Sequence, residues 1–394
     1  MSLIGVVWRK EVLENLRDRR TMLSSLVFGP LFAPIMFSVM IHIIVNQAVS
    51  SAQEELDVPT IGAERAPNLV EFLRARGINA TSDHGLTELE QAAEAVRHDQ
   101  YDIVIVIDPD FGETFTERSA ARVTVVFDRS SSRDSGRAQR VQNVLNAYSQ
   151  QIGALRLLAR GLSPDLVRPI LVDEYDVSTP AGRSALILGV LTYFLLFATL
   201  VGGLHVAIDT TAGERERKSL EPLLTTPISR TRLLTGKIAA TATFMLFSLA
   251  LTLAGFTVAL RFVPLEQLGM SSGFGLPTAL AAFGILAPIA PLGATLLTLV
   301  ASFTKSYKEA QTYLGLLLLV PTLPVIVATL LNVEASPALM WIPSMSQHLL
   351  VTALIKAEPV NPVMLAESVL STLAIGGVLG FIAARLYKRE GLLG

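Results

Sequence analysis

The sequence predicts an α-helical polytopic membrane protein, with six transmembrane helices and an extracytoplasmic α/β domain inserted between the first two. Apolar residues occupy 51% of the 394 positions and charged residues only 17%, whereas soluble chains carry about 25% charged residues. The apolar residues gather in discrete runs, and a helix needs about 20 such residues to cross a bilayer. Between the first two runs lies a long stretch of mixed composition, which predicts a separately folded domain.

Six apolar runs predict the transmembrane helices. Five of them contain no charged residue, and the sixth contains only Glu367, near its start. The predicted helices cover residues 21–45, 184–208, 238–260, 277–301, 310–331 and 362–384. The first run is too long for the apolar core of a cleaved signal peptide, so we interpret it as an uncleaved helix.

Two further segments are predicted at the membrane surface. Residues 1–20 predict a cytoplasmic interfacial helix whose basic residues favour anionic lipid headgroups. Its apolar stripe, which Glu11 and Asn15 interrupt, consists of Ile4, Trp8, Val12 and Leu16. Residues 336–358 contain two prolines and several polar residues. They predict a re-entrant or interfacial pair of short helices, with an ordinary outer loop as the alternative.

The distribution of Lys and Arg predicts the orientation. Short segments on one side of the membrane hold 16 of these residues, and those on the other side hold only Arg261 and Lys356. Because positive residues stay in the cytoplasm, we expect both termini to be cytoplasmic in a multi-pass protein of the cell (inner or plasma) membrane. Residues 209–236 then form a cytoplasmic loop, and residues 385–394 form a cytoplasmic tail.

Residues 46–182 are the predicted extracytoplasmic domain. Three aliphatic runs predict strands, namely Val58–Ile61, Ile103–Ile107 and Val123–Phe127. Helical periodicity surrounds these runs, so we expect a small mixed sheet covered by helices. Asp108, Asp110 and Asp128 follow strands, where ligand sites of α/β folds often lie. The alternative is that they serve only as turn and helix-capping residues.

The composition excludes several kinds of chemistry. The chain has no cysteine, and no spacing of nucleophile and base or of metal ligands appears. Gly236–Lys237 lacks the upstream glycine and the following hydroxyl of a phosphate-binding loop, so the chain cannot hydrolyse ATP by that route. We expect no cofactor in this chain. The net charge of -2 gives no support to nucleic-acid binding.

The most distinctive segment is Gly213-Glu-Arg-Glu-Arg-Lys-Ser-Leu-Glu-Pro-Leu-Leu-Thr-Thr-Pro227, in which charged residues precede leucines between two membrane-length runs. It resembles the first cytoplasmic loop of ABC-2 type permeases, and it is especially similar to that of NatB-type sodium-export permeases. The similarity extends to the layout of nearly the whole chain. Both have an interfacial N-terminal helix, one span, a large outer insert and five further spans.

The resemblance implies a coupling helix from Glu214 to about Leu224, seated in a groove of a separate ABC ATPase subunit that binds ATP and Mg. In such a groove, leucines fill an apolar cleft and charged residues pair across the rim. The candidate coupling residues are Glu214, Arg215, Glu216, Arg217, Leu220, Glu221, Leu223 and Leu224. Asp209, at the membrane end of the loop, is expected to pair with a nearby arginine. The alternative is a solvated helix whose basic residues only fix the topology.

Paired prolines mark a candidate translocation path. Proline frees the carbonyl four residues earlier. Free carbonyls are therefore expected at Gly284 and Ala287 in the fourth predicted helix and at Leu317 and Val320 in the fifth. Such carbonyls hold cations in broken helices. The candidate residues are Pro288, Pro291, Pro321, Pro324, Thr295 and Glu367. Glu367 and the nearby His348 are expected at an outer gate. Kinks that only fit the helix bundle are the alternative, and no carboxylate cluster identifies a metal site.

On this interpretation the chain is not an enzyme but the permease subunit of an ATP-driven exporter, embedded in lipid. The resemblance implies a second permease chain, in a homodimer or a heterodimer, and favours sodium as the substrate. One alternative is a permease for a lipid, a drug or another hydrophobic substrate. A second is a mechanotransmitting subunit that moves nothing across the membrane, and a third is an enzyme or sensor domain on a membrane anchor.

Overall fold

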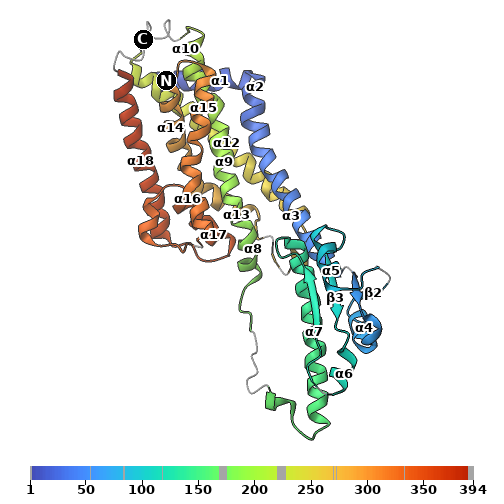
Figure 1. The fold of residues 1–394 in the computed structure, drawn as a ribbon. Coiled ribbons are helices and arrows are strands. Elements are labelled where there is room, and N and C mark those ends of the chain that lie inside the picture. Colours follow the sequence, from blue (N-terminus) through green and yellow to red (C-terminus); the bar gives the residue numbers. More distant parts are fainter. Residues whose placement is uncertain are drawn as a thin grey trace. The chain divides into compact units, whose positions relative to one another are not determined.

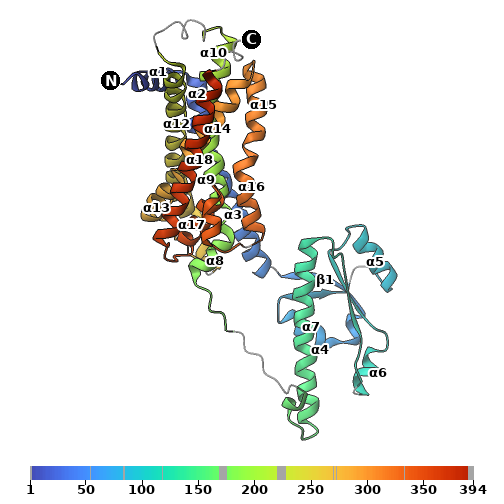
Figure 2. The same cartoon turned by 90° about the vertical axis from the view of Figure 1, so that its left-hand side faces the viewer.

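The computed structural model divides the chain into two compact units, a helical unit of residues 1–45 and 177–394 and an inserted unit of residues 46–176. The structure describes residues 2–53, 55–82, 85–117, 119–167, 175–219, 228–268, 270–271, 273–331 and 333–388. Figures 1 and 2 show that the inserted unit contains a β-sheet, whereas the other is built of helices.

The helical unit begins with two α-helices, which are followed by a π-helix and a long α-helix. These elements are α1 (Leu3–Arg17), α2 (Arg19–Met22), the π-helix η1 (Leu23–Phe28) and α3 (Gly29–Gln53). After the inserted unit follow α8 (Pro180–Leu188), α9 (Leu191–Ile208), the π-helix η4 (Asp209–Gly213) and α10 (Glu214–Glu216). The next long helix is α12 (Arg230–Ala259), which leads into 3-10 turns at Leu260–Phe262 and Leu265–Leu268.

The rest of the helical unit contains several broken helices. Its elements are α13 (Leu276–Leu286), α14 (Ile289–Phe303), α15 (Tyr307–Leu317), α16 (Leu319–Leu330), the 3-10 helix η7 (Pro337–Trp341), α17 (Met345–Ile355) and α18 (Pro362–Lys388). A pair of short helices, η7 and α17, thus occupies the segment for which the sequence predicts re-entrant or interfacial helices.

Five helical segments are long and apolar enough to cross a membrane. They are Ser25–Asn46, Leu191–Glu216, Arg230–Phe262, Tyr307–Leu330 and Pro362–Leu386. The helices α13 and α14 add a sixth crossing if they count as one span, since they pass the same test together and bend by 45° at their break. The prediction of a polytopic helical membrane protein is therefore confirmed, with five or six spans among the described residues.

Two of these helices extend beyond the ends that the sequence predicts. The second crossing continues to Glu216 instead of ending at residue 208, and α12 begins at Arg230 instead of residue 238. The predicted ends rested on the first charged residue of each segment. That criterion fails here because Asp209 pairs with Arg217 and Lys237 is buried beside Glu214, so neither charge ends its helix.

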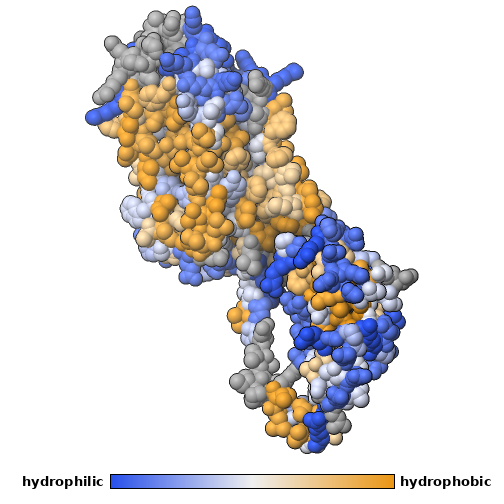
Figure 3. Space-filling model, viewed as in Figure 1, coloured by the Kyte–Doolittle hydropathy of each residue, from blue (hydrophilic) through white to orange (hydrophobic). Residues whose placement is uncertain are grey.

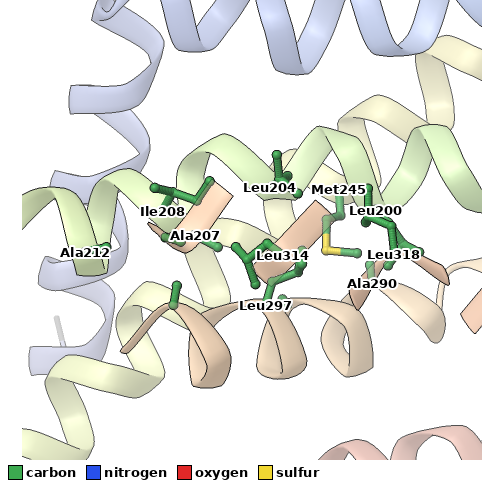
Figure 4. Packing of buried hydrophobic residues seen from close by; sticks show 13 residues of the cluster. Leu200, Leu204, Ala207, Ile208, Ala212, Met245, Ala290, Leu297, Leu314 and Leu318 are labelled. Atoms are coloured by element: carbon green, nitrogen blue, oxygen red, sulfur yellow. The ribbon is translucent and has the colours of Figure 1, made fainter. Parts of the chain in front are cut away.

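Helix α9 forms the centre of the helical unit, where it packs against α12, α14 and α16. Figure 4 shows Leu200, Leu204 and Ile208 of α9 gathered with Met245, Leu297 and Leu314 from the surrounding helices. Two glycines permit this close packing. A Cβ atom at Gly203 would lie 2.5 Å from Met245 Cγ, and one at Gly293 would lie 2.6 Å from Met245 Cε. Small residues are the usual means of close helix contact in membranes.

The surface of the helical unit has an apolar band and a charged end. Figure 3 shows apolar side chains over its sides and hydrophilic ones at the end that carries α10. In both ribbon views, α1 and the last turns of α18 lie at this same end (Figures 1 and 2). A bilayer would cover the apolar sides and leave the α10 end in water.

The inserted unit is an α/β fold with helices on both faces of its sheet. Its elements are β1 (Leu56–Ile61), α4 (Pro67–Arg74), β2 (Ile78–Thr81), α5 (Leu89–Arg97), β3 (Ile103–Ile107), α6 (Phe111–Thr116), β4 (Val123–Phe127) and α7 (Ser132–Leu158), with 3-10 turns at Ala63–Arg65 and Pro164–Val167. The strand order is β2-β1-β3-β4, with β4 antiparallel to β3 and the other pairs parallel. Helices α4 and α7 pack on one face and α5 on the other.

The predicted mixed sheet is thus observed, with two elements that the sequence analysis missed. Strand β2 has only Ile78 as a buried apolar residue, and α6 is too short to show a period. The aspartates behave as turn residues. The Asp128 carboxylate accepts the Ser130 backbone N–H at 2.8 Å, and this hydrogen bond lowers the pKa of Asp128. Among the described residues, no group of three or more His, Asp or Glu could hold a metal ion.

Candidate functional site

The charged residues singled out by the sequence lie where α9 leads into the loop that precedes α12. We call residues 209–219, comprising η4, α10 and the following turn, the loop root. The loop root is mostly buried up to Glu214 and exposed from Glu216 onward. A π-helix such as η4 often marks a functional site, because its wider turn aims side chains away from the regular helical positions.

The predicted coupling helix ends earlier than expected. Helix α10 stops at Glu216, and Lys218 adopts the left-handed φ of 55°. The Lys218 N–H donates to the Arg215 carbonyl and the Ser219 N–H donates to the Glu214 carbonyl, both at 3.0 Å, which is the Schellman pattern of a helix end. A helix running from Glu214 to Leu224 is therefore wrong for residues 217–219. The candidates Leu220, Glu221, Leu223 and Leu224 lie outside the described residues.

Glu214 is buried beside a lysine that the sequence analysis did not select. Glu214 is 5% exposed and Lys237 of α12 is fully buried. The Lys237 ammonium group donates to the Glu214 carboxylate and to the Thr210 carbonyl. Lys10 of α1 approaches the other carboxylate oxygen, Oε1, at 3.4 Å. Buried lysine and glutamate are rare unless paired, so these contacts explain how both charges are held in the interior.

Arg215 and Glu216 connect the loop root to the junction between α14 and α15. The Arg215 guanidinium donates to the carbonyls of Ser302 and Thr304 at 2.9 and 3.0 Å, at the carboxyl end of α14. The Glu216 carboxylate accepts the Tyr307 N–H at 2.7 Å, at the first residue of α15. Each charge is complementary to the helix end that it binds, because carboxyl ends attract cations and amino ends attract anions.

Asp209 and Arg217 form an ion pair of 2.9 Å, which confirms the expectation that Asp209 pairs with a nearby arginine. Their side chains are 22% and 56% exposed. An exposed pair contributes about 0–1 kcal/mol to stability. Of the four described coupling candidates, Glu214 and Arg215 thus hold buried or half-buried positions within the chain. Glu216 and Arg217 are exposed to solvent.

The candidate translocation residues do not form one cluster. Pro288 caps α14 at the 45° bend, and Pro321 and Pro324 lie in α16. Helix α9 contacts both α14 and α16, the helices at which the two proline pairs lie. The expected free carbonyl of Ala287 is wrong, because it accepts the Ala290 N–H at 3.0 Å.

Polar candidates in the membrane helices also find partners close by. The Thr295 hydroxyl donates to the Pro291 carbonyl at 2.8 Å within its own helix, as hydroxyls in membrane helices commonly do. His348 lies 3.3 Å from the Thr329 hydroxyl on α16. Glu367 is half-buried, and its Oε2 atom has no hydrogen-bond partner among the described residues. The described contacts therefore do not join Glu367 and His348 into a gate.

The inserted unit has a groove of about 700 Å³ between α6, β4 and α7. Phe115, Val125 and Tyr148 line it, and the Arg156 guanidinium lies over the Phe115 ring at 4.6 Å. Arg156 also donates to the Phe115 carbonyl at 2.7 Å. No carboxylate or histidine belongs to the described lining, so the groove has no acid–base pair for hydrolysis.

Comparison with known proteins agrees with this membrane architecture. The model of the ABC-2 family transporter proteins matches residues 20–385, which include every candidate residue named above. The chain belongs to the ABC-2 transporter family. It is 25% identical over 327 residues to the ABC transporter permease protein NatB of Bacillus subtilis (strain 168), covering 82% of this chain and 81% of that protein. This ABC-2 protein is therefore a permease subunit of an ABC transporter.

The ABC-2 protein has functional candidates that its sequence alone did not reveal. Glu11, Asn15, Gly236 and Lys237 all lie at the contact of α1 with α12. A signal was present in the sequence, since Glu11 and Asn15 interrupt the apolar stripe of this helix at a spacing of one turn. Such a spacing places both side chains on one face.

Proposed function

We propose that this ABC-2 permease exports sodium ions, driven by a separate ABC ATPase subunit that binds ATP and Mg and docks on the loop after α9. The proposal places the α10 end of the helical unit in the cytoplasm, together with both termini. It places the inserted unit outside the cell membrane. Resemblance to NatB-type permeases supports sodium, and the excess of Lys and Arg at this end supports the orientation.

One observation carries the coupling role. Arg215 and Glu216 fasten the loop root to the ends of α14 and α15, while Glu214 fastens it to α12. A force applied to the loop root would therefore act on the ends of several transmembrane helices together. Charge-assisted hydrogen bonds are short and about twice as strong as neutral ones. They suit a joint that transmits motion.

The exposed part of the loop root supports a partner surface. Glu216, Arg217 and Lys218 face solvent next to the segment that contains Leu220 and Leu223. Charges of both signs around apolar side chains are typical of a rim and core that bind a folded partner. A second permease chain, identical or related, completes the proposed transporter, because each ATPase pair is expected to serve two such chains.

The docking role has a direct test. Changing Leu220 and Leu223 together to Asp should abolish copurification with the ATPase, because an apolar cleft does not accept two carboxylates without large desolvation cost. Membrane insertion should be unchanged, since both residues lie outside the predicted spans. Leu155 and Leu158, exposed on α7 and also outside the predicted spans, offer a matched control pair for the same change. Undiminished copurification of the loop variant would refute the docking role.

The substrate has a separate test. The permease and its ATPase, reconstituted in proteoliposomes, should move ²²Na⁺ when ATP is supplied on the side of the loop. Movement of a lipid or drug without sodium would show that sodium is not the substrate, and the proposed exporter mechanism would still hold. ATP turnover without any flux would instead favour a mechanotransmitting role.

A further inference from the structure

We infer that Gly236 and Lys237 form a seat for helix α1, and that Lys237 is a positioning residue for energy coupling. The seat holds α1, the loop root and the start of α12 together so that they move as one body. This inference rests on the proposed function, because it concerns how motion of the ATPase reaches the spans. Three observations carry it: close backbone packing, polar side chains on the buried face of α1, and a set of opposite charges that join α1, α12 and the loop root.

The first observation is the close approach of α1 to α12 at Gly236. A Cβ atom at Gly236 would lie 2.6 Å from Val7 Cγ1 and 3.3 Å from the Ile4 carbonyl oxygen. Only glycine therefore fits at this position without displacing α1. About two turns further along α12, Thr243 accepts a hydrogen bond of 2.9 Å from the Trp8 indole. Packing and hydrogen bonding thus fix α1 along α12 at two points.

The second observation is that α1 buries two polar side chains. Its buried residues are Val7, Glu11 and Asn15, which follow one another at intervals of one turn and share one face. Its exposed residues are mixed, since Leu3, Val6, Leu13 and Leu16 lie among exposed charged residues. A helix that only rests on lipid would bury no carboxylate. The burial of Glu11 and Asn15 therefore indicates that this face contacts protein.

The third observation is the charge set beneath that face. Lys10 and Glu11 of α1 meet Glu214 and Lys237, and the four formal charges sum to zero. Burial raises the pKa of Glu11, and the nearby Lys237 opposes that rise. For Lys10, burial favours a lower pKa, but Glu11 and Glu214 outweigh it and raise the pKa. Lys10 and Lys237 both contact Glu214, so one carboxylate of the loop root joins α1 to α12.

This arrangement explains why Lys237 acts through position and not through substrate. Its ammonium group ends on the Glu214 carboxylate and the Thr210 carbonyl, both in the loop root, and its side chain has no exposed surface. When the loop root shifts, Lys237 pulls the start of α12, and Lys10 pulls α1 through the same carboxylate. A purely structural lysine would need only a neutralising partner. Here the pair also determines which helices follow the loop.

The first experiment separates positioning from charge neutralisation. Lys237→Met alone leaves the buried Glu214 carboxylate without its main cationic partner. The double variant Lys237→Met, Glu214→Leu removes both charges, so we expect it to fold. In proteoliposomes with the ATPase bound, we expect the double variant to hydrolyse ATP while sodium moved per ATP falls about tenfold, within the usual range of coupling free energies. Sodium moved per ATP at the wild-type value would show that Lys237 only neutralises a buried charge, and would overturn the inference.

The second experiment does not depend on the substrate. The chain has no cysteine, so a Val7→Cys, Gly236→Cys pair can be crosslinked without background. The Cβ positions lie 2.7 Å apart, and a shift of about 1 Å gives the spacing of a disulfide. We expect equal crosslinking in the nucleotide-free complex and in the complex trapped with ADP and vanadate, because α1 and α12 move together. Loss of the crosslink in the trapped state would overturn the inference.

A matched control, and a way to tell failure of the inference from failure of the proposed function, complete the experiments. Val6→Cys with Gly236→Cys should not crosslink, because Val6 faces away and is 48% exposed. If the ATPase does not copurify with the wild-type chain, the proposed function fails. If the ATPase copurifies, but the crosslink is lost in the trapped state or the sodium moved per ATP stays at the wild-type value in the double variant, only the inference about the seat is refuted. The two failures are therefore distinguishable.

Discussion

Two buried polar networks of the helical unit fasten short helices by different means. At the α10 end, Lys237, Glu214 and Lys10 join α1 to α12 through ion pairs. In the second network, Gln347 of α17 donates to Ser368 and Thr372 of α18 at 3.0 and 2.8 Å and accepts the Ser344 N–H at 2.7 Å. Gln347, Ser368 and Thr372 are fully buried, and all three are neutral.

The difference between the networks follows from how each interaction depends on distance. The energy of an ion pair falls only as the inverse of the separation, so attraction persists when helices shift. Hydrogen bonds between neutral groups weaken steeply once distance or angle departs from the optimum. An ionic network can therefore hold helices together while they shift, whereas a neutral network suits helices that keep fixed relative positions. The comparison predicts that α1 stays attached during coupling while α17 remains immobile on α18.

The largest expected effect is on the ionic network. Lys237→Met leaves the Glu214 carboxylate buried with only the more distant Lys10, and breaking a buried pair costs about 3–5 kcal/mol. We expect a large fall in the melting temperature of the purified protein in detergent. Lys10→Met is the matched control, because Lys10 is 43% exposed and Lys237 continues to neutralise Glu214 in that variant, so we expect a smaller fall. Equal melting of the two variants would contradict the assignment of Lys237 as the buried member.

The neutral network should give a smaller effect. Gln347→Leu removes the partner of the Ser344 N–H and of two buried hydroxyls, and each unsatisfied buried group costs about 1–3 kcal/mol. The expected result is a moderate fall in melting temperature with ATP turnover preserved, since α17 is not part of the moving joint. Thr322→Val is the control, because this buried hydroxyl bonds only carbonyls of its own helix. Melting of Gln347→Leu at the wild-type temperature would show that the network does not fasten α17.

The same two networks show what the sequence was able to predict. Apolar runs identified the helices, and aliphatic runs identified three of the strands, because both signals are local. Asp209 and Arg217 are eight residues apart, and that pair was also predicted. Lys10 and Glu214 are 204 residues apart, so no local pattern relates them. The burial of Glu11 became intelligible only when α12 supplied Lys237 opposite its face.

Two site expectations failed for reasons that are also physical. The coupling helix was predicted to pass through Lys218, but the left-handed turn there caps the carbonyls of α10 and ends it. Proline was predicted to free the Ala287 carbonyl, but the local turn at the bend lets Ala290 bond it instead. Both outcomes depend on how a helix end satisfies its orphan carbonyls. Composition and spacing do not specify that choice.

The smallest expected effect is a pH dependence at Glu11, on the side of α1 that faces the seat. Burial raises the pKa of this carboxyl above its ordinary value of 4.5. The contribution of Glu11 to the free energy of unfolding is fully present below pH 4.5, where the carboxyl group is protonated. This contribution is lost as the pH rises through the raised pKa. At pH 7 the ionised, buried carboxylate therefore destabilises the docked helix. Neutral Gln at position 11 does not titrate and keeps the ability to hydrogen-bond Lys10.

Glu11→Gln should therefore melt at a higher temperature than the wild type at pH 7, and the two should converge towards pH 4.5. Glu14→Gln is the matched control, because Glu14 pairs with the same Lys10 at 3.1 Å but is 59% exposed. Melting curves recorded between these pH values provide the measurement. A higher melting temperature for Glu11→Gln that did not change with pH would assign the gain to packing. A lower one at pH 7 would mean that the charge of Glu11 stabilises the contact, and the ionic joint would then depend on all four charges.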